Sequence, residues 1–273
     1  MTAVPLRMAA LGIGPFTGDA STLLAEAKAG IVRLAGLGAT LILLPELFAA
    51  PFYAASSPAE WAHLAEPVDG KTGLWAARLA AATGASIVYG MPVAGSDEFL
   101  PSNAVVLAAP GQRPQVVQRK VHLPPRGDDA FGEADHFAPG APAITAFRHR
   151  GACICPLVCY DRRFPESWRE AARLSADVVL VLVGGPANDP PGLFEAEIRT
   201  HARANAVYAL AAARYGQEEI GGATRRHDGL TLAATPCGGL LPATGHAAMI
   251  EIDSAALSKA RAQNPTHRQL RLY

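Results

Sequence analysis

Three polar residues of this sequence, Glu46, Lys120 and Cys159, each stand at the end of a separate apolar segment. Together they would supply a base, a cation and a soft nucleophile, which covalent attack on a carbonyl or nitrile carbon requires. Each has a simpler explanation on its own. Glu46 could cap a helix, Lys120 could be a solvated surface charge, and Cys159 could be a small core residue, as free Cys usually is. The chemistry depends on whether the fold brings them together.

The segments before these residues are expected to be strands. Short apolar runs bounded by turn residues predict buried strands, and such runs occupy residues 40–44, 116–122 and 152–158. Lys120 lies near the far end of the second run, and the other two residues follow their runs. Open α/β sheets build their sites at the carboxyl ends of strands, so this arrangement favours one shared site.

Strands and helices alternate along the chain without a linker, an internal repeat or a low-complexity tract. This pattern predicts a single layered α/β domain over residues 1–273, with a C-terminal arm from about residue 255. Helices are predicted at 20–37, 72–83, after Cys159 to about 174, at 194–205, and from 255 onward. Strands are predicted at 6–13, 40–44, 85–90, 103–109, 116–122, 144–147, 152–158, 177–183, 208–213, 229–234 and 247–252. The strands 103–109 and 116–122 are expected to form a hairpin, and the last two a final pair.

The composition excludes several classes of protein. Half of the 273 residues are hydrophobic and 18% are charged, which is typical of a globular protein with a large core. The 24 Lys and Arg residues balance 24 Asp and Glu residues, so nucleic acids and anionic membranes are poor candidate partners. No apolar run approaches the roughly 20 residues that span a bilayer. With no recognisable secretory signal and four Cys, we expect a cytoplasmic protein without disulfides.

Other familiar motifs are incomplete. Thr17 stands where the dinucleotide-binding fingerprint that begins at Gly12 needs its third glycine, and Ala65 stands where a phosphate-binding loop ending in Gly70-Lys71-Thr72 needs its first. No Gly-x-Ser-x-Gly nucleophile motif is present. The spacing of the three Cys residues at 153, 155 and 159 is unlike that of zinc ligands, so no metal site is expected.

Three segments resemble the signature motifs of the nitrilase, or carbon–nitrogen hydrolase, superfamily. They are Pro45-Glu46-Leu47-Phe48, Arg119-Lys120-Val121-His122-Leu123 and Cys159-Tyr160-Asp161-Arg162-Arg163-Phe164-Pro165-Glu166. The resemblance covers nearly the whole chain. It implies an αββα sandwich that usually dimerises so that the sheets of two subunits stack, giving a homodimer or a higher homo-oligomer. It also implies a Glu-Lys-Cys triad without a metal or organic cofactor.

The resemblance assigns a role to each of these residues. It implies that Glu46 is the general base, Lys120 the cation beside the oxyanion and Cys159 the nucleophile. Glu133, in the long polar segment 124–142, matches a family glutamate that positions the substrate and the catalytic groups. The backbone N–H of Tyr160 is expected to help stabilise the oxyanion.

The residues after the nucleophile bear on the reaction. Tyr160-Asp161 resembles the amidase branches, whereas nitrile-cleaving members tend to carry Trp-Glu and carbamoyl-hydrolysing members often carry Trp-Asp. We therefore expect hydrolysis of a small linear amide to a carboxylic acid and ammonia. The alternatives are a nitrilase, an N-carbamoyl amine or amino-acid hydrolase with the same triad, and a non-enzymatic member that uses the fold for assembly.

Some residues near the expected pocket have two interpretations or differ from the family. Arg162 or Arg163 could bind a substrate carboxylate in a fork, or could form a structural ion pair with Glu166 or Asp161. His122 and His136 could line the mouth, although a single His near a site is more often structural. The family motif Arg-Ala-x-Glu-Asn is replaced by residues 201–205, His-Ala-Arg-Ala-Asn, and a frequent tryptophan is absent from residues 186–194. These differences bear on the substrate more than on the triad.

Overall fold

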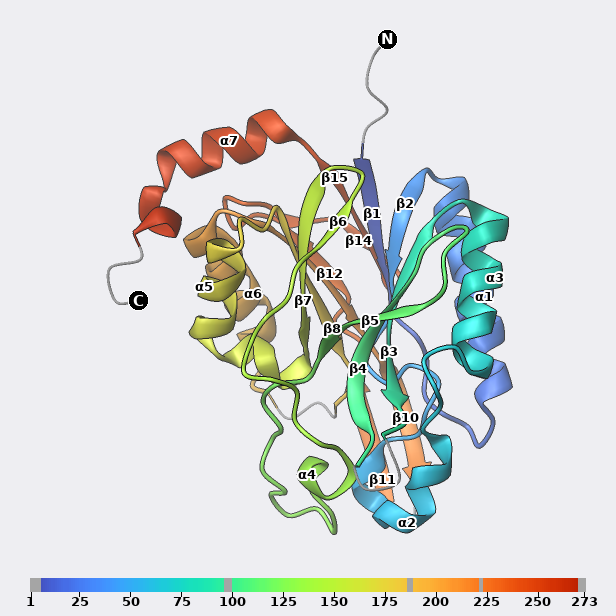
Figure 1. The fold of residues 1–273 in the computed structure, drawn as a ribbon. Coiled ribbons are helices and arrows are strands. Elements are labelled where there is room, and N and C mark those ends of the chain that lie inside the picture. The colour runs from blue at the N-terminus through green and yellow to red at the C-terminus, as the bar shows by residue number, and fades with distance from the viewer. Residues whose placement is uncertain (1–5, 96–99, 186–188, 221–222, 270–273) are drawn as a thin grey trace.

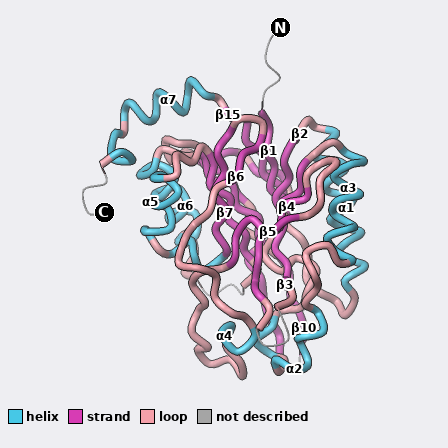
Figure 2. Tube along the Cα trace, in the orientation of Figure 1, coloured by secondary structure: helices cyan, strands magenta, loops and turns pink. Residues whose placement is uncertain are grey.

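The computed structural model describes residues 6–95, 100–185, 189–220 and 223–269. Two β-sheets pack face to face, and helices cover the outer face of each (Figure 1). Figure 2 shows the strands in the middle of the molecule with helices on both sides. This is the αββα arrangement expected from the sequence, and the predicted fold class is confirmed.

The strands form two sheets and a separate hairpin. The first sheet contains, in spatial order, β14 (Ala243–Thr244), β15 (Ala247–Ile252), β1 (Leu6–Leu11), β2 (Ala39–Leu43), β3 (Ser86–Val93), β4 (Ser102–Ala108) and β5 (Gln115–Arg119). The second contains β13 (Leu240–Leu241), β12 (Leu232–Ala234), β9 (Tyr208–Ala213), β8 (Val178–Val183), β7 (Ala152–Val158) and β6 (Phe147–His149). The hairpin consists of β10 (Tyr215–Ile220) and β11 (Ala223–Asp228).

The helices fall into four groups. The long helices α1 (Ala20–Gly36) and α3 (Lys71–Thr83) cover the first sheet, and α5 (Pro165–Arg173) and α6 (Leu193–Asn205) cover the second (Figure 1). The short helices α2 (Pro58–Trp61) and α4 (Glu133–His136) lie at the end of the molecule where the β10–β11 hairpin lies (Figure 1). Helix α7 (Ser254–Gln263) follows β15. Single 3-10 turns occupy Tyr53–Ala55, Ala62–Leu64, Cys159–Arg163 and Pro265–Arg268.

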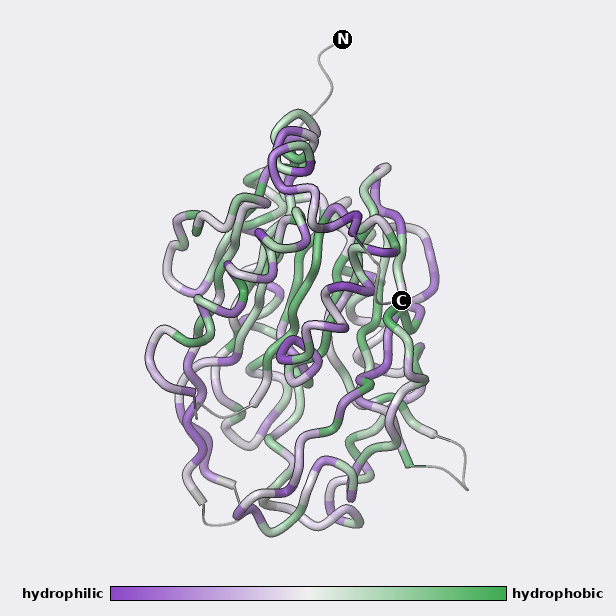
Figure 3. The backbone as a smooth tube through the Cα atoms, turned by 90° about the vertical axis from the view of Figure 1, so that its left-hand side faces the viewer, coloured by the Kyte–Doolittle hydropathy of each residue, from purple (hydrophilic) through white to green (hydrophobic). Residues whose placement is uncertain are grey.

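The continuous apolar runs are explained by burial on both faces of each sheet. Neighbouring residues of a strand point to opposite faces, so Leu41 packs between the two sheets whereas Ile42 packs against the helices on the outside. On the second sheet, Leu180 and Val181 divide in the same way. Strands such as β2 and β8 are therefore hydrophobic along their length, and the middle of the molecule is largely green in Figure 3. Full burial of each large apolar side chain is worth about 1.5–3 kcal/mol, and this burial holds the layers together.

Most predicted elements are present, but two strand predictions are wrong. The strand expected at 144–147 begins only at Phe147, because the N–H of Thr145 donates to the side chain of Gln118 (2.8 Å) instead of joining a ladder. The runs 229–234 and 247–252 do not pair. Their strands β12 and β15 belong to different sheets and pair with β9 and β1.

The two sheets bring several strand ends to one end of the molecule. β2 is parallel to β3, and β7, β8 and β9 are parallel to one another. β4 and β5 return antiparallel, so the start of β4 and the end of β5 lie beside the end of β3. Loops that follow parallel strands at such an edge are where α/β proteins place their sites. The residues after β2, β5 and β7 are the three singled out in the sequence.

Candidate active site

Glu46 is fixed by two glycines that let the backbone approach closely. A Cβ on Gly90 would lie 2.5 Å from Glu46 Cα, and one on Gly184 would lie 2.7 Å from Glu46 O, so no larger residue fits at either position. The next residue, Leu47, has a φ of 46°, in the left-handed region that is costly for a residue with a side chain. Glu46 is 3% exposed, so it is a buried carboxylate and not a helix cap.

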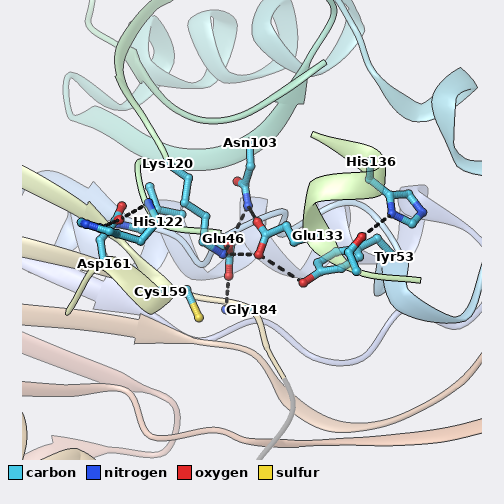
Figure 4. A network of polar contacts seen from close by, with 12 residues as sticks. Glu46, Tyr53, Asn103, Lys120, His122, Glu133, His136, Cys159, Asp161 and Gly184 are labelled. Carbon is cyan, nitrogen blue, oxygen red and sulfur yellow. Dashed lines mark hydrogen bonds and ion pairs between the residues drawn. The ribbon is translucent and has the colours of Figure 1, made fainter. Parts of the chain in front are cut away.

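Lys120 joins two buried carboxylates. Its Nζ lies 2.8 Å from Glu46 Oε1 and 2.6 Å from Glu133 Oε2 (Figure 4). Asn103 Nδ2 also bridges the two carboxylates, donating to Glu46 Oε1 (2.7 Å) and Glu133 Oε1 (2.8 Å). The hydroxyl of Tyr53 donates to Glu133 Oε2 (3.1 Å). Lys120 is 2% exposed, so it is not a solvated surface charge.

The charges in this network shift one another's ionisation. Burial works to lower the pKa of Lys120, but the charges of Glu133 and Glu46 overcome it and hold that pKa well above its ordinary value. Burial raises the pKa of Glu133 above its usual range, the charge of Lys120 opposes this, and that of Glu46 adds to it. The Lys120 side chain is therefore positively charged at neutral pH, and this one charge is paired with two carboxylates.

Cys159 begins a 3-10 turn directly after β7, with a φ of 44°. Arg162 Nη1 donates to its carbonyl oxygen (3.2 Å). Asp161 is fully buried and accepts hydrogen bonds from the backbone N–H groups of Val158 (3.4 Å), at the end of β7, and His122 (2.8 Å), after Lys120. One carboxylate thus ties the turn that carries the thiol to the segment that carries the cation.

The thiol of Cys159 faces the same network. Burial, with the charge of Glu46, raises its pKa to about 11, against the opposing effects of Lys120, Arg162 and a hydrogen bond from Gly184 N–H. Gly184 N–H also donates to Glu46 Oε2 (3.0 Å). At neutral pH the resting group is the protonated thiol, so a reaction through its sulfur needs a base nearby.

This pKa predicts how the thiol reacts with a probe. Because the thiolate is the reactive form, we expect alkylation of Cys159 by iodoacetamide to accelerate about tenfold per pH unit between about pH 7 and pH 10. A small free thiol measured in parallel should level off near its ordinary pKa of about 8.5. Peptide mass spectrometry after timed labelling gives the rate at Cys159. A plateau of that rate below about pH 9 would mean that the resting site already holds a thiolate.

A cavity of about 500 Å³ opens beside these groups. Glu46, Lys120, Glu133 and Cys159 all line it, and so does Tyr160. Its wall also contains the aromatic rings of Phe52, Tyr53 and Phe194, together with three prolines, five arginines and carboxylates from several loops. Cavities of this volume bind small molecules. The structure thus brings all five residues of the predicted site to one cavity.

Arg162 and Arg163 already have protein partners. Arg162 is 4% exposed and pairs with Asp189 (2.8 Å) and Glu197 (2.9 Å). Arg163 also pairs with Asp189. The structural interpretation of these arginines is thus favoured, but the partners expected from the sequence, Glu166 and Asp161, are wrong. The carboxylates that pair with them lie about 30 residues further along the chain, where the sequence offers no pattern that points to them.

The two histidines near the site have structural contacts. The ring of His122 stacks on Phe164 with 3.7 Å between ring centroids, and its Nδ1 lies 2.8 Å from Asp161 Oδ1. His136 is 2% exposed and its ring nitrogens lie near the carbonyl oxygens of Gly132 (3.0 Å) and Ser56 (2.9 Å). Both hold loops around the cavity in place.

The sequence missed two members of the network, Asn103 and Tyr53. Asn103 had a usable signal, because it is a polar amide in a strand that is otherwise apolar. No pattern in the sequence pointed to Tyr53.

Among the substituted family positions, His201 stacks on Trp168, with ring centroids 5.0 Å apart. Part of the segment that lacks the family tryptophan, residues 186–188, lies outside the described residues.

Within the part of the chain that the structure describes, no group of three or more His, Cys, Asp or Glu side chains is placed to hold a metal ion. In the same residues, no helix combines the length and the apolar character that crossing a membrane would require.

The site and the fold can now be compared with known proteins. The family model described as carbon-nitrogen hydrolase matches residues 7–264. The chain belongs to the carbon-nitrogen hydrolase family. The resemblance seen in the three motifs is confirmed, and the protein is a hydrolase that acts on carbon–nitrogen bonds.

Relatives of this hydrolase include an amidase and an N-carbamoyl amine amidase. It is 28% identical to an (R)-stereoselective amidase of a Pseudomonas species over 248 residues, which cover 89% of this chain and 84% of that one. It is 29% identical to the N-carbamoylputrescine amidase of Solanum lycopersicum over 243 residues, covering 84% and 79% of the two chains.

A solved structure of an amidase shares the fold. A variant of the amidase from Nesterenkonia sp. AN1, with acrylamide added to its active-site cysteine, superposes with a TM-score of 0.76 at 24% identity. The match covers 97% of this hydrolase and 99% of that chain.

Proposed function

We propose that this hydrolase converts a small linear amide to a carboxylic acid and ammonia through a thioester on Cys159. The observation that carries the proposal is the burial of one lysine between two carboxylates beside this thiol, at the wall of a cavity of about 500 Å³. The amidases among the relatives support the reaction class, and the modified active-site cysteine of the Nesterenkonia amidase supports the nucleophile.

The first half of the reaction forms the thioester. Glu46 takes the proton of the Cys159 thiol as the sulfur attacks the amide carbon, and the carbonyl oxygen becomes an oxyanion. Lys120, with the backbone N–H of Tyr160, stabilises that oxyanion, and each such donor is worth about 3–4 kcal/mol. Glu46 then passes the proton to the nitrogen, which leaves as ammonia. This sequence suits a thiol whose raised pKa keeps it protonated until the substrate arrives.

The second half releases the acid. A water molecule enters where ammonia left, Glu46 removes a proton from it, and the resulting hydroxide attacks the thioester carbon. The carbon–sulfur bond breaks, the carboxylic acid leaves, and the proton returns to Cys159. Glu133 takes no proton in this sequence. It holds Lys120 from the other side, while Asn103 and Tyr53 fix its own position by hydrogen bonds.

The same residues could serve a related substrate. The N-carbamoylputrescine amidase among the relatives makes an N-carbamoyl amine the second candidate. A nitrile would also give a thioester on Cys159 after one hydration step, and an assembly protein would use the fold without turnover. The dipeptide Tyr160-Asp161 favours the amide over these alternatives.

Mass spectrometry of the intact protein tests the proposal directly. We expect incubation with a library of short amides to add an acyl group to Cys159 and to release ammonia. Nitriles should give little acid, and N-carbamoyl amines little carbon dioxide. Carbon dioxide from the carbamoyl compounds, or acid from the nitriles, would move the assignment to that reaction. If no compound of any class modified Cys159 or was turned over, an assembly role would be favoured.

The proposal also covers the domain organisation, the oligomeric state and the cellular compartment. We infer that the chain acts as one catalytic domain and as a homodimer whose sheets stack across the subunit interface. The four cysteines are free, which suits a reducing compartment such as the cytoplasm.

A further inference from the structure

A second group of buried ionisable side chains lies outside the triad. Arg214, Glu218 and His227 are 2%, 0% and 3% exposed. Arg214 directly follows β9, whereas Glu218 and His227 lie on the two strands of the β10–β11 hairpin. Buried charges are costly unless they are paired, so such a group is normally retained for a reason. The reaction proposed above does not use it.

The carboxylate of Glu218 is surrounded by donors. It accepts hydrogen bonds from the backbone N–H groups of Phe16 (3.1 Å) and Phe52 (3.0 Å). It also pairs with Arg214, and the Nε2 of His227 lies 3.2 Å from its Oε1. Glu218 therefore joins the hairpin to two loops from the first sheet.

Arg214 and His227 contact backbone carbonyl oxygens on two different sides of the catalytic cavity. Arg214 Nη1 donates to the carbonyl oxygen of Ala50 (2.8 Å), on the segment that follows Glu46. On the other wall, His227 Nδ1 lies 3.3 Å from the carbonyl oxygen of Gly185. A Cβ on Gly185 would lie 3.7 Å from Cys159 Sγ, so this peptide directly flanks the nucleophile.

Arg214 is also coupled electrostatically to the general base. It lines the same cavity as Glu46. Burial lowers the pKa of Arg214, while the charges of Glu218 and then Glu46 oppose that effect. Two buried cations, Lys120 and Arg214, thus act on Glu46, and Glu218 balances the second of them.

We propose that Glu218 is a positioning residue of this active site, holding the main chain after Glu46 through Arg214 and the main chain beside Cys159 through His227. The inference rests on the proposed function. It adds that the β10–β11 hairpin, which contributes none of the reacting groups, sets the geometry in which Cys159 and Glu46 work.

The test compares Glu218→Gln with Glu219→Gln. Glu219 is the next residue of the same strand, and its side chain is exposed. We expect Glu218→Gln to lower kcat by about 10–100-fold with little change in KM, because misplacement by about 1 Å can cost 100-fold. The alkylation rate of Cys159 should rise severalfold, because its walls loosen and the charge of Arg214 is no longer balanced. Glu219→Gln should match the wild-type protein in both measurements.

Circular dichroism and thermal unfolding separate positioning from a structural role. A folded Glu218→Gln protein with wild-type kcat and wild-type alkylation of Cys159 would overturn the proposal. So would a fall in kcat that only follows a fall in the folded fraction. If Glu218→Gln does not fold, His227→Leu, which removes the contact with Gly185, is measured in the same way. Unchanged kcat and alkylation in that variant, or its failure to fold as well, would equally overturn the proposal.

The alkylation measurement keeps this inference separate from the proposed function. If the wild-type protein turns over no amide, the proposed function fails. The comparison of Cys159 alkylation between Glu218→Gln and Glu219→Gln still decides whether Glu218 positions the thiol.

Discussion

Replacement of Cys159 by alanine is expected to lower kcat/KM for amide hydrolysis by a factor on the order of 10⁴ or more. Removal of a covalent nucleophile in other enzymes has effects of this size, because the remaining groups can only bind and polarise the substrate. In this hydrolase the thiol is the only group at the cavity that the proposed reaction uses to form a covalent bond. Ammonia release from the best amide of the library measures the effect.

A matched variant makes this result specific. Cys237 is free and exposed, and it does not line the cavity. Cys237→Ala should therefore keep the wild-type kcat/KM, and both variants should unfold at about the wild-type temperature. Turnover by Cys159→Ala within about tenfold of the wild-type rate would show that the nucleophile is assigned wrongly.

The sequence was sufficient to predict the layers and the place of the site. Continuous apolar runs such as residues 40–44 indicate strands buried on both faces, which is typical of a layered domain. That the layers include two sheets was implied only by the family resemblance. Polar residues at the ends of such strands must gather at one edge, and Glu46, Lys120 and Cys159 do. Apart from the number of sheets, these predictions depend only on local pattern and on the geometry of parallel strands.

The sequence predicted the hairpin of β4 and β5 but not the pairing of segments that lie far apart in the chain. The runs that form β12 and β15 are both short and apolar, and nothing in either run distinguishes a partner in one sheet from a partner in the other. The β10–β11 hairpin was missed because its strands are rich in charged residues, which local patterns assign to solvent. Its buried charges are stabilised by partners as distant as Phe16, about 200 positions earlier in the chain.

The network around Lys120 likewise contains residues that the sequence predicted and residues that it did not. Its two carboxylates were found because they belong to recognisable motifs. Tyr53 was missed because it acts through a contact made only in the fold. Asn103 was missed although it is a polar amide in an apolar strand, because that signal does not say which residues it contacts. The partners of Arg162 illustrate this as well. An ion pair with a nearby residue of the same turn was the natural expectation. Asp161 instead contacts backbone N–H groups and the ring of His122, and the arginine pairs with Asp189 and Glu197.

Replacement of Lys120 by methionine is expected to abolish measurable turnover and to destabilise the protein at neutral pH by about 3–5 kcal/mol. Methionine fits the space but removes the cation between Glu46 and Glu133, and breaking a buried ion pair from one side costs this much. The free energy of unfolding, from urea titration followed by circular dichroism, measures the loss. Lys28→Met, at an exposed position of α1, is the control and should stay within about 0.5 kcal/mol of the wild-type protein.

The loss of unfolding free energy in Lys120→Met should also depend on pH, and its direction follows from the raised pKa of Glu133. A carboxyl group whose pKa is higher in the folded than in the unfolded protein binds more protons when folded, so stability falls as the pH rises through that interval. Without Lys120 to oppose burial, the pKa of Glu133 in the folded protein rises further in Lys120→Met. The pH interval between the unfolded-state and folded-state pKa values of this carboxyl group therefore widens. The stability difference between the variant and the wild-type protein should therefore shrink between about pH 7.5 and pH 5. A difference that is constant over this range would mean that the lost packing of the lysine, and not the two uncompensated carboxylates, causes the destabilisation.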